Sequence, residues 1–285
     1  MDDLVRVARG VWRASSEVDD FAALCAALLQ AMPPGTVVGG SSAARLHGLW
    51  LPPVQPRRVE MITRRDPAVP RQLGHSRRVE VRARRRTLQP SDVVRHDGLP
   101  LTSPARTWCD LAESLSMADL VATGDSVLRV GCDLDAMRDA LHRAFRRRGV
   151  VKAREALPLL DARARSRPES HLRYALVRAG LPLPEVNSPI FSENGEWLAE
   201  PDLHYEEARL ALEYNGAQHA EPGRMRHDIT RDLDYQWADW RVITFGPKQV
   251  FDRPDQVATL VRAVLVERAP QLFRRATVSS RRVAR

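Results

Sequence analysis

The chain has 285 residues, of which 44% are hydrophobic and 28% charged, a composition typical of folded globular proteins rather than disordered ones. The longest nearly apolar run, residues 21–32, is too short to span a bilayer, and the first twenty residues mix charges without an apolar signal core. Three cysteines stand far apart without a CxxC pair, which excludes a disulfide scaffold and a zinc finger. We therefore expect a cytoplasmic protein that does not enter a membrane.

Charge is distributed unevenly along the chain, whose formal net charge is +8. Residues 57–86 contain eleven arginines against three acidic residues, whereas residues 193–239 contain twelve acidic residues against four arginines. The first stretch can hold a polyanion and the second can hold cations. Arginine outnumbers lysine 42 to 2, which codon usage alone can produce. Charge therefore leaves both a nucleic-acid ligand and a solvated surface open.

The length suggests two domains, and the first half of the sequence predicts a small sheet with several helices. Apolar residues at helical spacing predict a helix over 17–32, and Ser41 is a candidate N-cap for a short helix over 42–49. Alternating residues predict strands over 59–63 and 79–85, the second with Val79, Val81 and Ala83 inward and its arginines outward. Further helices are predicted over 104–115, 117–130, 134–147 and 150–160. In the first of these, Arg106 and Trp108 are expected to pack and cap rather than form a site.

The short, polar, arginine-rich segment 161–168 is the best candidate for a domain boundary, giving domains at 1–165 and 166–285. The second domain predicts an α/β sandwich around a small sheet. A turn signal at Asn194-Gly195 joins its first two strands as a hairpin. The expected order is helix 169–179, strands 186–191, 198–204 and 209–214, helix 223–238, strand 241–245 and helix 254–268. The predicted fold class is thus α/β (α+β), a mixed N-terminal domain followed by a sandwich.

Acidic residues of the second domain stand where folding would bring them together. Asp202 follows Pro201 on the second predicted strand, Glu213 lies near the end of the third, and Glu169 opens the preceding helix. Adjacent strands lie about 4.8 Å apart, so two such carboxylates on one face can share a hard cation such as Mg²⁺. Glu213 also follows an apolar run, where a charge is costly unless it is used. The alternative, that both are ordinary solvated strand residues, stays open.

The acidic residues belong to a longer series of motifs. The series is Glu169, Pro201-Asp202, Glu213-Tyr214-Asn215-Gly216-Ala217-Gln218-His219, Asp228-Ile229-Thr230-Arg231 and Asp239-Trp240-Arg241-Val242. With these motifs, residues 168–268 resemble the PD-(D/E)XK nuclease superfamily, and within it the branch similar to Vsr-type endonucleases. The resemblance implies a restriction-endonuclease-like α/β/α sandwich and hydrolysis of phosphodiester bonds.

The resemblance also implies a role for each matching residue. Asp202, Glu213 and the Tyr214 carbonyl would hold Mg²⁺ or Mn²⁺, and Glu169 would be reached through water. His219 would take a proton from the attacking water or contact the leaving group. The supporting residues of the motif are Asn215, Gly216, Asp228 and Arg231. Asn215 replaces the lysine of the superfamily and the aspartate of the branch, and an amide cannot act as a base.

The first domain carries a second resemblance. Residues 38–49 (VGGSSAARLHGL) and 97–112 (DGLPLTSPARTWCDLA), with an arginine-rich two-strand region between them, resemble AbiEi-family antitoxins of type IV toxin–antitoxin systems over about residues 20–130. The resemblance implies DNA and a cognate toxin or defence partner as ligands. A phosphate-contacting face would consist of Arg57, Arg58, Arg64, Arg65, Arg82, Arg84, Arg85 and Arg86, with Arg45 and His47. A solvated strand face is the alternative.

Together these patterns predict a metal-dependent DNA endonuclease whose basic N-terminal domain holds DNA, in a defence or toxin–antitoxin setting. The alternative is an antitoxin-like DNA-binding regulator built on a silenced nuclease fold. Phosphate chemistry and arginine contacts do not distinguish DNA from RNA.

Overall fold

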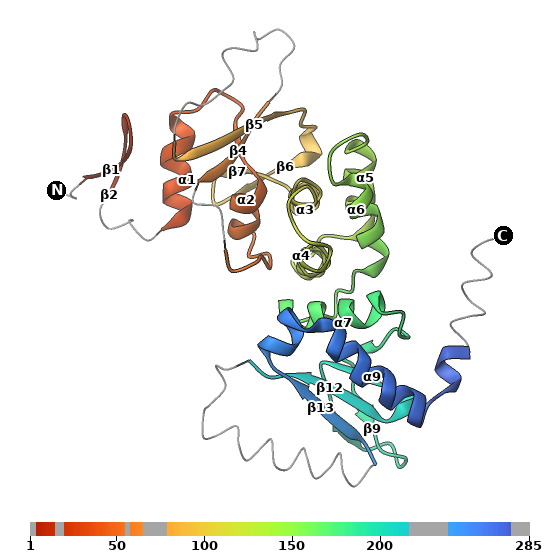
Figure 1. Ribbon diagram of the computed structural model, residues 1–285. Helices are drawn as coiled ribbons and strands as arrows, with labels where there is room; N and C mark the ends of the chain where they lie inside the picture. Colours follow the sequence, from red (N-terminus) through yellow and green to blue (C-terminus); the bar gives the residue numbers. More distant parts are fainter. Residues whose placement is uncertain (1–3, 15–19, 55–57, 65–78, 217–238, 275–285) are drawn as a thin grey trace. The chain divides into compact units, whose positions relative to one another are not determined.

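The computed structural model describes residues 4–14, 20–54, 58–64, 79–216 and 239–274. The chain divides into two compact units, Met1–Pro158 and Leu159–Arg285. Each unit combines helices with small sheets, which confirms the predicted α+β class (Figure 1). The division lies a few residues before the polar segment 161–168. Among the described residues, no helix is long and apolar enough to cross a membrane.

The first unit is built on a five-stranded mixed sheet in the order β5-β4-β3-β7-β6. Parallel pairing joins β4 to β5 and β3 to β7, and antiparallel pairing joins β3 to β4 and β6 to β7. The hydrophobic core lies between this sheet and the first helix, with Val38, Met61 and Leu28 among its buried residues. The strands are β3 (Val37–Val38), β4 (Val59–Arg64), β5 (Val81–Arg86), β6 (Val93–His96) and β7 (Leu99–Thr102).

In the described part of the first unit, six α-helices accompany the sheet, and α3 to α6 gather on one side of it (Figure 1). The helices are α1 (Phe21–Gln30), α2 (Gly40–Leu46), α3 (Pro104–Leu111), α4 (Met117–Arg129), α5 (Leu134–Arg143) and α6 (Val150–Ala156), with short 3-10 turns at Pro90–Asp92 and Leu157–Leu159. Local side chains set where most of them begin, because a Ser or Asp oxygen accepts a hydrogen bond from a first-turn N–H. These N-caps are Asp20, Ser103, Ser116 and Asp133.

Several details of the first unit differ from the sequence-based expectation. Ser41 is not the N-cap of α2; Gly39 occupies that position, and Ser41 lies inside the helix. Val79 does not face inward: the strand begins two residues later, and Val79 is 70% exposed. An antiparallel pair, β1 (Leu4–Ala8) and β2 (Val11–Ala14), was not expected; its buried Ala8 and Val11 pack in the same core cluster as α1.

Trp108 and Arg106 confirm the expectation that α3 supplies packing residues. The Trp108 side chain is fully buried and its Nε1 donates to the Leu120 carbonyl at 2.9 Å. Arg106 is 2% exposed and is held by carboxylates.

The second unit contains a four-stranded sheet in the order β13-β12-β11-β8 and a separate hairpin of β9 and β10. The helices α7 and α9 pack against each other, and Figure 1 shows them on one side of β12 and β13. The elements are α7 (Arg167–Arg178), β8 (Glu185–Val186), β9 (Ile190–Phe191), β10 (Trp197–Ala199), β11 (Leu203–Tyr205), β12 (Leu210–Tyr214), β13 (Arg241–Phe245) and α9 (Pro254–Arg268), with short helical turns at Glu206–Ala208 and Lys248–Asp252.

Two predicted strands of the second unit are each broken in two. The strand predicted over 186–191 is interrupted after Val186, where Asn187 adopts the left-handed conformation with φ 42°. The strand predicted over 198–204 is interrupted at Pro201, whose missing N–H cannot join a ladder. The hairpin expected at Asn194-Gly195 is present, because β9 and β10 pair around it. The helix predicted over 223–238 lies outside the described residues.

Candidate functional site

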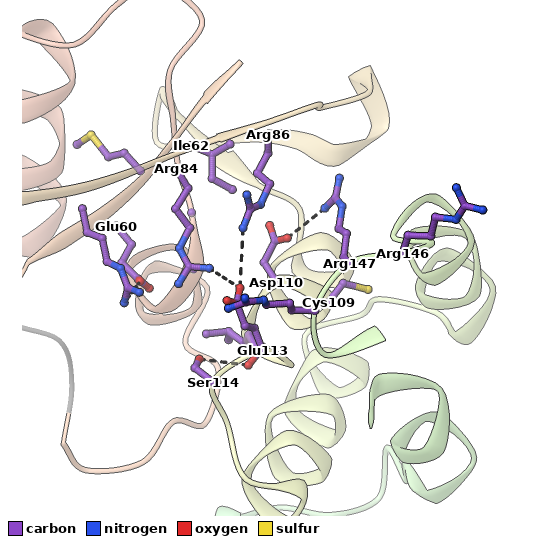
Figure 2. A pocket seen from close by; sticks show the side chains of 16 residues that line it. Glu60, Ile62, Arg84, Arg86, Cys109, Asp110, Glu113, Ser114, Arg146 and Arg147 are labelled. Carbon is purple, nitrogen blue, oxygen red and sulfur yellow. Dashed lines mark hydrogen bonds and ion pairs between the residues drawn. The ribbon is translucent and has the colours of Figure 1, made fainter. Parts of the chain in front are cut away.

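A cavity of about 440 Å³ in the first unit gathers arginines from two separate parts of the chain (Figure 2). Strand β5 forms one side, and the end of α3 with the turn after α5 forms the other. We call this cavity the arginine pocket. Its charged lining residues are Arg82, Arg84, Arg86, Arg146, Arg147 and Arg148 and the carboxylates Glu60, Asp110 and Glu113. Six positive charges against three negative ones leave an excess of three.

The arginines of β5 reach the pocket because a strand alternates its side chains. Residues 82, 84 and 86 share one face, and Val81 on the other face is buried. In Figure 2, Arg84 and Arg86 extend from β5 toward Glu113, which follows α3. One oxygen, Oε2 of Glu113, lies 2.7 Å from Arg84 Nη1 and 3.8 Å from Arg86 Nη2. A single carboxylate thus serves two guanidinium groups.

Glu60 is the second counter-ion, and Gly40 explains its position. Its Oε2 accepts hydrogen bonds from the Ser41 N–H at 2.7 Å and the Ser41 hydroxyl at 2.9 Å. A Cβ on Gly40, which has φ +56°, would stand 2.3 Å from this oxygen, so only glycine lets the carboxylate come so close. The other oxygen, Oε1, lies 3.4 Å from Arg82 Nη1. Gly40 therefore leaves room for an acidic group in the pocket wall.

A glycine also positions the turn that carries Arg146, Arg147 and Arg148. Gly149 has φ +82°, and a Cβ there would lie 2.5 Å from the backbone carbon of Ala112. The turn can therefore lie directly against the end of α3, beside Glu113. Sequence reasoning did not include these three arginines in the site, although the run Arg-Arg-Arg-Gly is visible at 146–149.

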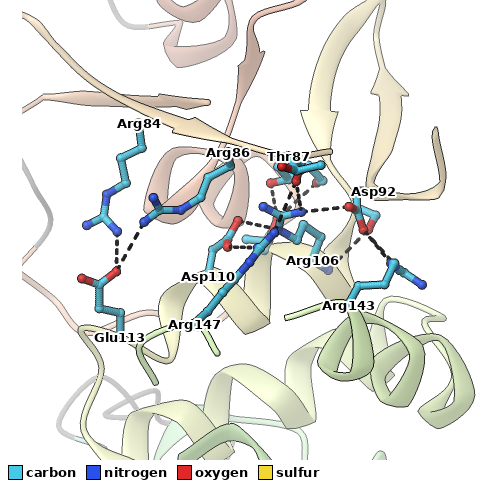
Figure 3. Close-up of polar contacts among 12 residues, drawn as sticks. Arg84, Arg86, Thr87, Asp92, Arg106, Asp110, Glu113, Arg143 and Arg147 are labelled. Atoms are coloured by element: carbon cyan, nitrogen blue, oxygen red, sulfur yellow. Dashed lines mark hydrogen bonds and ion pairs between the residues drawn. The ribbon is translucent and has the colours of Figure 1, made fainter. Parts of the chain in front are cut away.

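A buried ion network beneath the pocket fixes Arg147 (Figure 3). At its centre is Arg106, which lies 2.8 Å from an oxygen of Asp92 and 2.8 Å from an oxygen of Asp110. Arg147 Nη1 contacts the other oxygen of Asp110 at 3.2 Å, and its Nη2 donates to the Thr87 carbonyl. Burial, followed by the like charge of Arg106, lowers the pKa of Arg147. The network thus holds a partly desolvated guanidinium beside a second one.

The other arginines predicted to contact phosphate do not line the arginine pocket or lie outside the described residues. Arg58 is exposed, and Arg85 is half-buried on the strand face opposite Arg84 and Arg86. Arg64 is the last residue of β4, and its side chain is not described. Arg57 and Arg65 lie outside the described residues. Thus Arg82, Arg84 and Arg86 are the predicted residues that the described structure brings into one pocket.

Arg45 and His47, also expected on that face, have other contacts. The Arg45 guanidinium carbon lies 4.0 Å from the centroid of the Phe21 ring. His47 Nε2 lies 2.8 Å from the Thr102 carbonyl oxygen. Both contacts tie α2 to neighbouring parts of the first unit.

In the second unit, the strand register brings Asp202 beside Glu213. Leu203 pairs with Leu212 in the antiparallel ladder, so the next pair outward is Asp202 with Glu213. The Asp202 Oδ2 accepts a hydrogen bond of 2.7 Å from the Tyr214 N–H, which fixes this carboxylate beside the Glu213–Tyr214 peptide. Carboxylate and carbonyl oxygens are the donors that Mg²⁺ takes, usually one or two carboxylates with water. These residues therefore fit a hard cation.

Glu169 lies near this pair through a shared neighbour rather than in one cluster with it. Its Oε2 accepts from the Arg165 N–H at 2.8 Å and from Asn187 Nδ2 at 2.8 Å, and the Asn187 N–H donates to the Asp202 carbonyl at 3.0 Å. Within the part of the chain that is described, no group of three His, Cys, Asp or Glu side chains could hold a metal ion.

Among the supporting residues of the motif, Asn215 and Gly216 are described. Asn215 is exposed and its N–H donates to the Phe245 carbonyl at 2.9 Å, which continues the pairing of β12 with β13. Gly216 lies against the ring of Tyr214; a Cβ added to this glycine would be 3.3 Å from a ring carbon. His219, Asp228 and Arg231 lie outside the described residues.

Comparison with known proteins gives a match for the first unit. Residues 36–162 match the family model of the AbiEi antitoxin C-terminal domain. Uncharacterized proteins from two strains of Mycobacterium tuberculosis, CDC 1551 / Oshkosh and ATCC 25618 / H37Rv, are each 35% identical over 169 residues, which is 59% of this chain and 62% of each relative. The chain thus spans less than two thirds of their length. No solved structure matches. The matched segment contains the whole arginine pocket and is similar to the AbiEi antitoxin C-terminal domain, as its motifs predicted.

Proposed function

We propose that the chain is an antitoxin-like regulator that binds nucleic acid through the arginine pocket, in a toxin–antitoxin or abortive-infection setting. The observation that carries the proposal is the excess of positive charge in a cavity inside the segment similar to an antitoxin domain. Like charges gathered in one cavity repel one another, and six arginines face only three carboxylates there. A bound phosphate would relieve this repulsion.

The contacts expected of such a pocket are to phosphates, not to bases. Arginine forks pair with phosphate oxygens in two parallel hydrogen bonds, which fix orientation and carry no base sequence. Each neutralised phosphate releases counter-ions, so affinity falls as salt rises. The proposed ligand is DNA, and RNA offers the same phosphate chemistry.

The salt dependence of binding tests this proposal. Fluorescence anisotropy would give the affinity of a labelled duplex between 50 and 200 mM salt, roughly the range over which such binding weakens. We expect a steep slope for the wild type, and a slope lower by about 0.9 for each phosphate contact removed in Arg82→Gln/Arg84→Gln/Arg86→Gln. Equal slopes for the two proteins would contradict the proposal.

A toxin partner is the second part of the proposal. The name of the matched family describes an antitoxin, so a protein encoded beside this chain is the first candidate for the toxin. Expression of that neighbour alone should arrest growth. Its co-expression with this chain should restore growth. Growth arrest that this chain does not relieve would contradict an antitoxin role.

Metal-dependent cleavage of DNA is a second candidate function, carried by the position of Asp202 beside Glu213. These two carboxylates and the Tyr214 carbonyl would hold Mg²⁺ or Mn²⁺. When bound, such an ion stabilises negative charge on a phosphate and acidifies water. Residues of the chain would orient the two carboxylates. The Tyr214 N–H donates to Asp202, and Asn187 bridges Glu169 and Asp202, because its side chain donates to Glu169 and its N–H donates to the Asp202 carbonyl.

Nicking of supercoiled plasmid in Mn²⁺ and then Mg²⁺ tests cleavage. We expect activity in the wild type that is lost in Asp202→Asn and in Glu213→Gln. Glu196→Gln, an exposed carboxylate in the β9–β10 turn, is the matched control and should cleave normally. An inert wild type would end the nuclease proposal and leave the regulator. Equal cleavage by all four proteins would exclude these carboxylates as its source.

A further inference from the structure

The arginine pocket has the size of a small-ligand site rather than of a nucleic-acid groove. Its volume of about 440 Å³ lies within the roughly 300–1,000 Å³ that sites enclosing a small molecule usually have. A duplex, whose major groove alone is about 12 Å wide, can contact the rim of such a cavity but cannot enter it. The group that enters must be compact and anionic.

The pocket offers guanidinium groups from two directions above an apolar floor. Arg84 and Arg86 come from β5, and Arg148 comes from the turn, where the Arg146 guanidinium instead lies 5.2 Å from the centroid of the Phe145 ring. Ile62 and Leu111 line the floor and are each 4% exposed. A phosphate monoester has three terminal oxygens that can accept from several arginines at once, whereas a diester has two. A monoester also carries about −1.5 to −2 charges, which matches the excess of positive charge better than the single charge of a diester.

Glu113 occupies the donors that such a ligand needs. Its Oε2 lies against both Arg84 and Arg86, and its side chain is 28% exposed at the pocket wall. An incoming anion competes with this carboxylate for Arg84, which it contacts at 2.7 Å, and for Arg86, from which it lies 3.8 Å away. A singly charged group competes with it on equal terms, and a doubly charged group has the advantage because Coulomb energy scales with charge. Glu113 would thus select for dianions.

We propose that the arginine pocket binds a terminal phosphate, a monoester carried by a nucleic-acid end or by a free nucleotide, which takes the place of Glu113 on Arg84 and Arg86. The inference rests on the proposed function in so far as the phosphate belongs to a nucleic-acid end. The free nucleotide is the other source of the same chemistry.

Calorimetry with matched probes tests the inference on the full chain. The probes are one single-stranded oligonucleotide with a phosphate at its 5′ end, at its 3′ end or at neither, and a nucleoside with and without its 5′-phosphate. We expect a terminal phosphate to tighten binding at least about tenfold. Arg84→Gln/Arg86→Gln should abolish that preference, and the charge-matched Arg129→Gln/Arg138→Gln, exposed on α4 and α5, should retain it.

A second variant, Glu113→Gln, is expected to bind more tightly, so misfolding cannot explain its result. Removing the competing carboxylate should tighten binding of the terminal phosphate by about three- to tenfold and leave the hydroxyl-ended probes nearly unchanged. Tighter binding cannot result from partial unfolding.

The outcomes separate this inference from the proposed function. Equal binding of phosphate-ended and hydroxyl-ended oligonucleotides, weakened in Arg84→Gln/Arg86→Gln, overturns the inference and leaves nucleic-acid binding in place. Binding of the nucleotide without either kind of oligonucleotide supports the inference and identifies the free nucleotide as the source of the phosphate. Binding of no probe overturns the inference, while the salt dependence of duplex binding decides the proposed function.

Discussion

The buried network around Arg106 makes the sharpest prediction about stability. Arg106 and Asp92 are each 2% exposed, and Arg106 also holds Asp110. Arg106→Met fills similar space but removes the positive charge between two carboxylates. Breaking a buried ion pair by removing one partner costs about 3–5 kcal/mol, since the other charge stays buried without compensation.

The contacts that remain place the expected loss at the lower end of that range. Asp92 keeps Arg143 at 3.2 Å and Asp110 keeps Arg147 at 3.2 Å. We therefore expect the free energy of unfolding to fall by about 3 kcal/mol, a large part of the 5–15 kcal/mol typical of a protein. In urea, with a slope of about 1–3 kcal/mol per molar, the midpoint should fall by about 1–3 M.

Urea unfolding of four proteins tests the reasoning as a double-mutant cycle. Asp92→Asn keeps the shape of the side chain and removes its negative charge. That charge is the one that Arg106→Met alone would leave buried without its partner. The double variant should therefore lose less stability than the sum of the single variants. Arg138→Met, at an exposed ion pair on α5, should change stability by no more than about 0.5 kcal/mol. Additive losses, or an Arg106→Met loss as small as that of Arg138→Met, would refute the account.

Three further predictions concern other parts of the chain. Gly149→Ala should lower the free energy of unfolding by more than about 2 kcal/mol, because the added Cβ would meet backbone atoms. The control Gly131→Ala, also at positive φ but with open space around it, should lower it by about 1 kcal/mol. Equal losses of stability in thermal melts would contradict this. Burial lowers the pKa of His204 below 6.5, so the stability that its neutral form contributes is complete above pH 6.5 and is lost as the pH falls below it. The urea midpoint of the wild type should fall between pH 7.5 and pH 5 by more than that of His204→Gln. Burial also raises the pKa of Cys25 and of Cys109 to about 12, so neither thiol should react with iodoacetamide in the folded protein, and both should react in denaturant.

Local signals in the sequence were enough to locate many elements. The predicted strand 241–245 and helix 254–268 have the bounds found in the structure, because Pro254 begins the helix and β-branched and aromatic residues favour the strand. The hairpin of β6 and β7 was missed, although Asp97-Gly98 between them is a strong two-residue turn signal and both residues have positive φ. That element was predictable.

The arginine pocket could be predicted only in part. Alternation along β5 placed Arg82 and Arg84 on one face, which the strand confirms. Their partners Glu113 and the 146–148 turn lie far along the chain, and their approach depends on the packing of Gly149 against α3. Such contacts come from tertiary structure and leave no local pattern. The pairing of Asp202 with Glu213 was foreseen from spacing, but the hydrogen bond that orients Asp202 was not.

The claim at the centre of this account is that the arginine pocket, rather than the total charge of the chain, holds nucleic-acid phosphates. The most direct measurement compares the dissociation constant of one labelled DNA for two variants that each lose two positive charges. We predict that Arg84→Gln/Arg86→Gln weakens binding at least about tenfold and that Arg129→Gln/Arg138→Gln changes it by less than about twofold. Equal weakening by the two variants would contradict the claim.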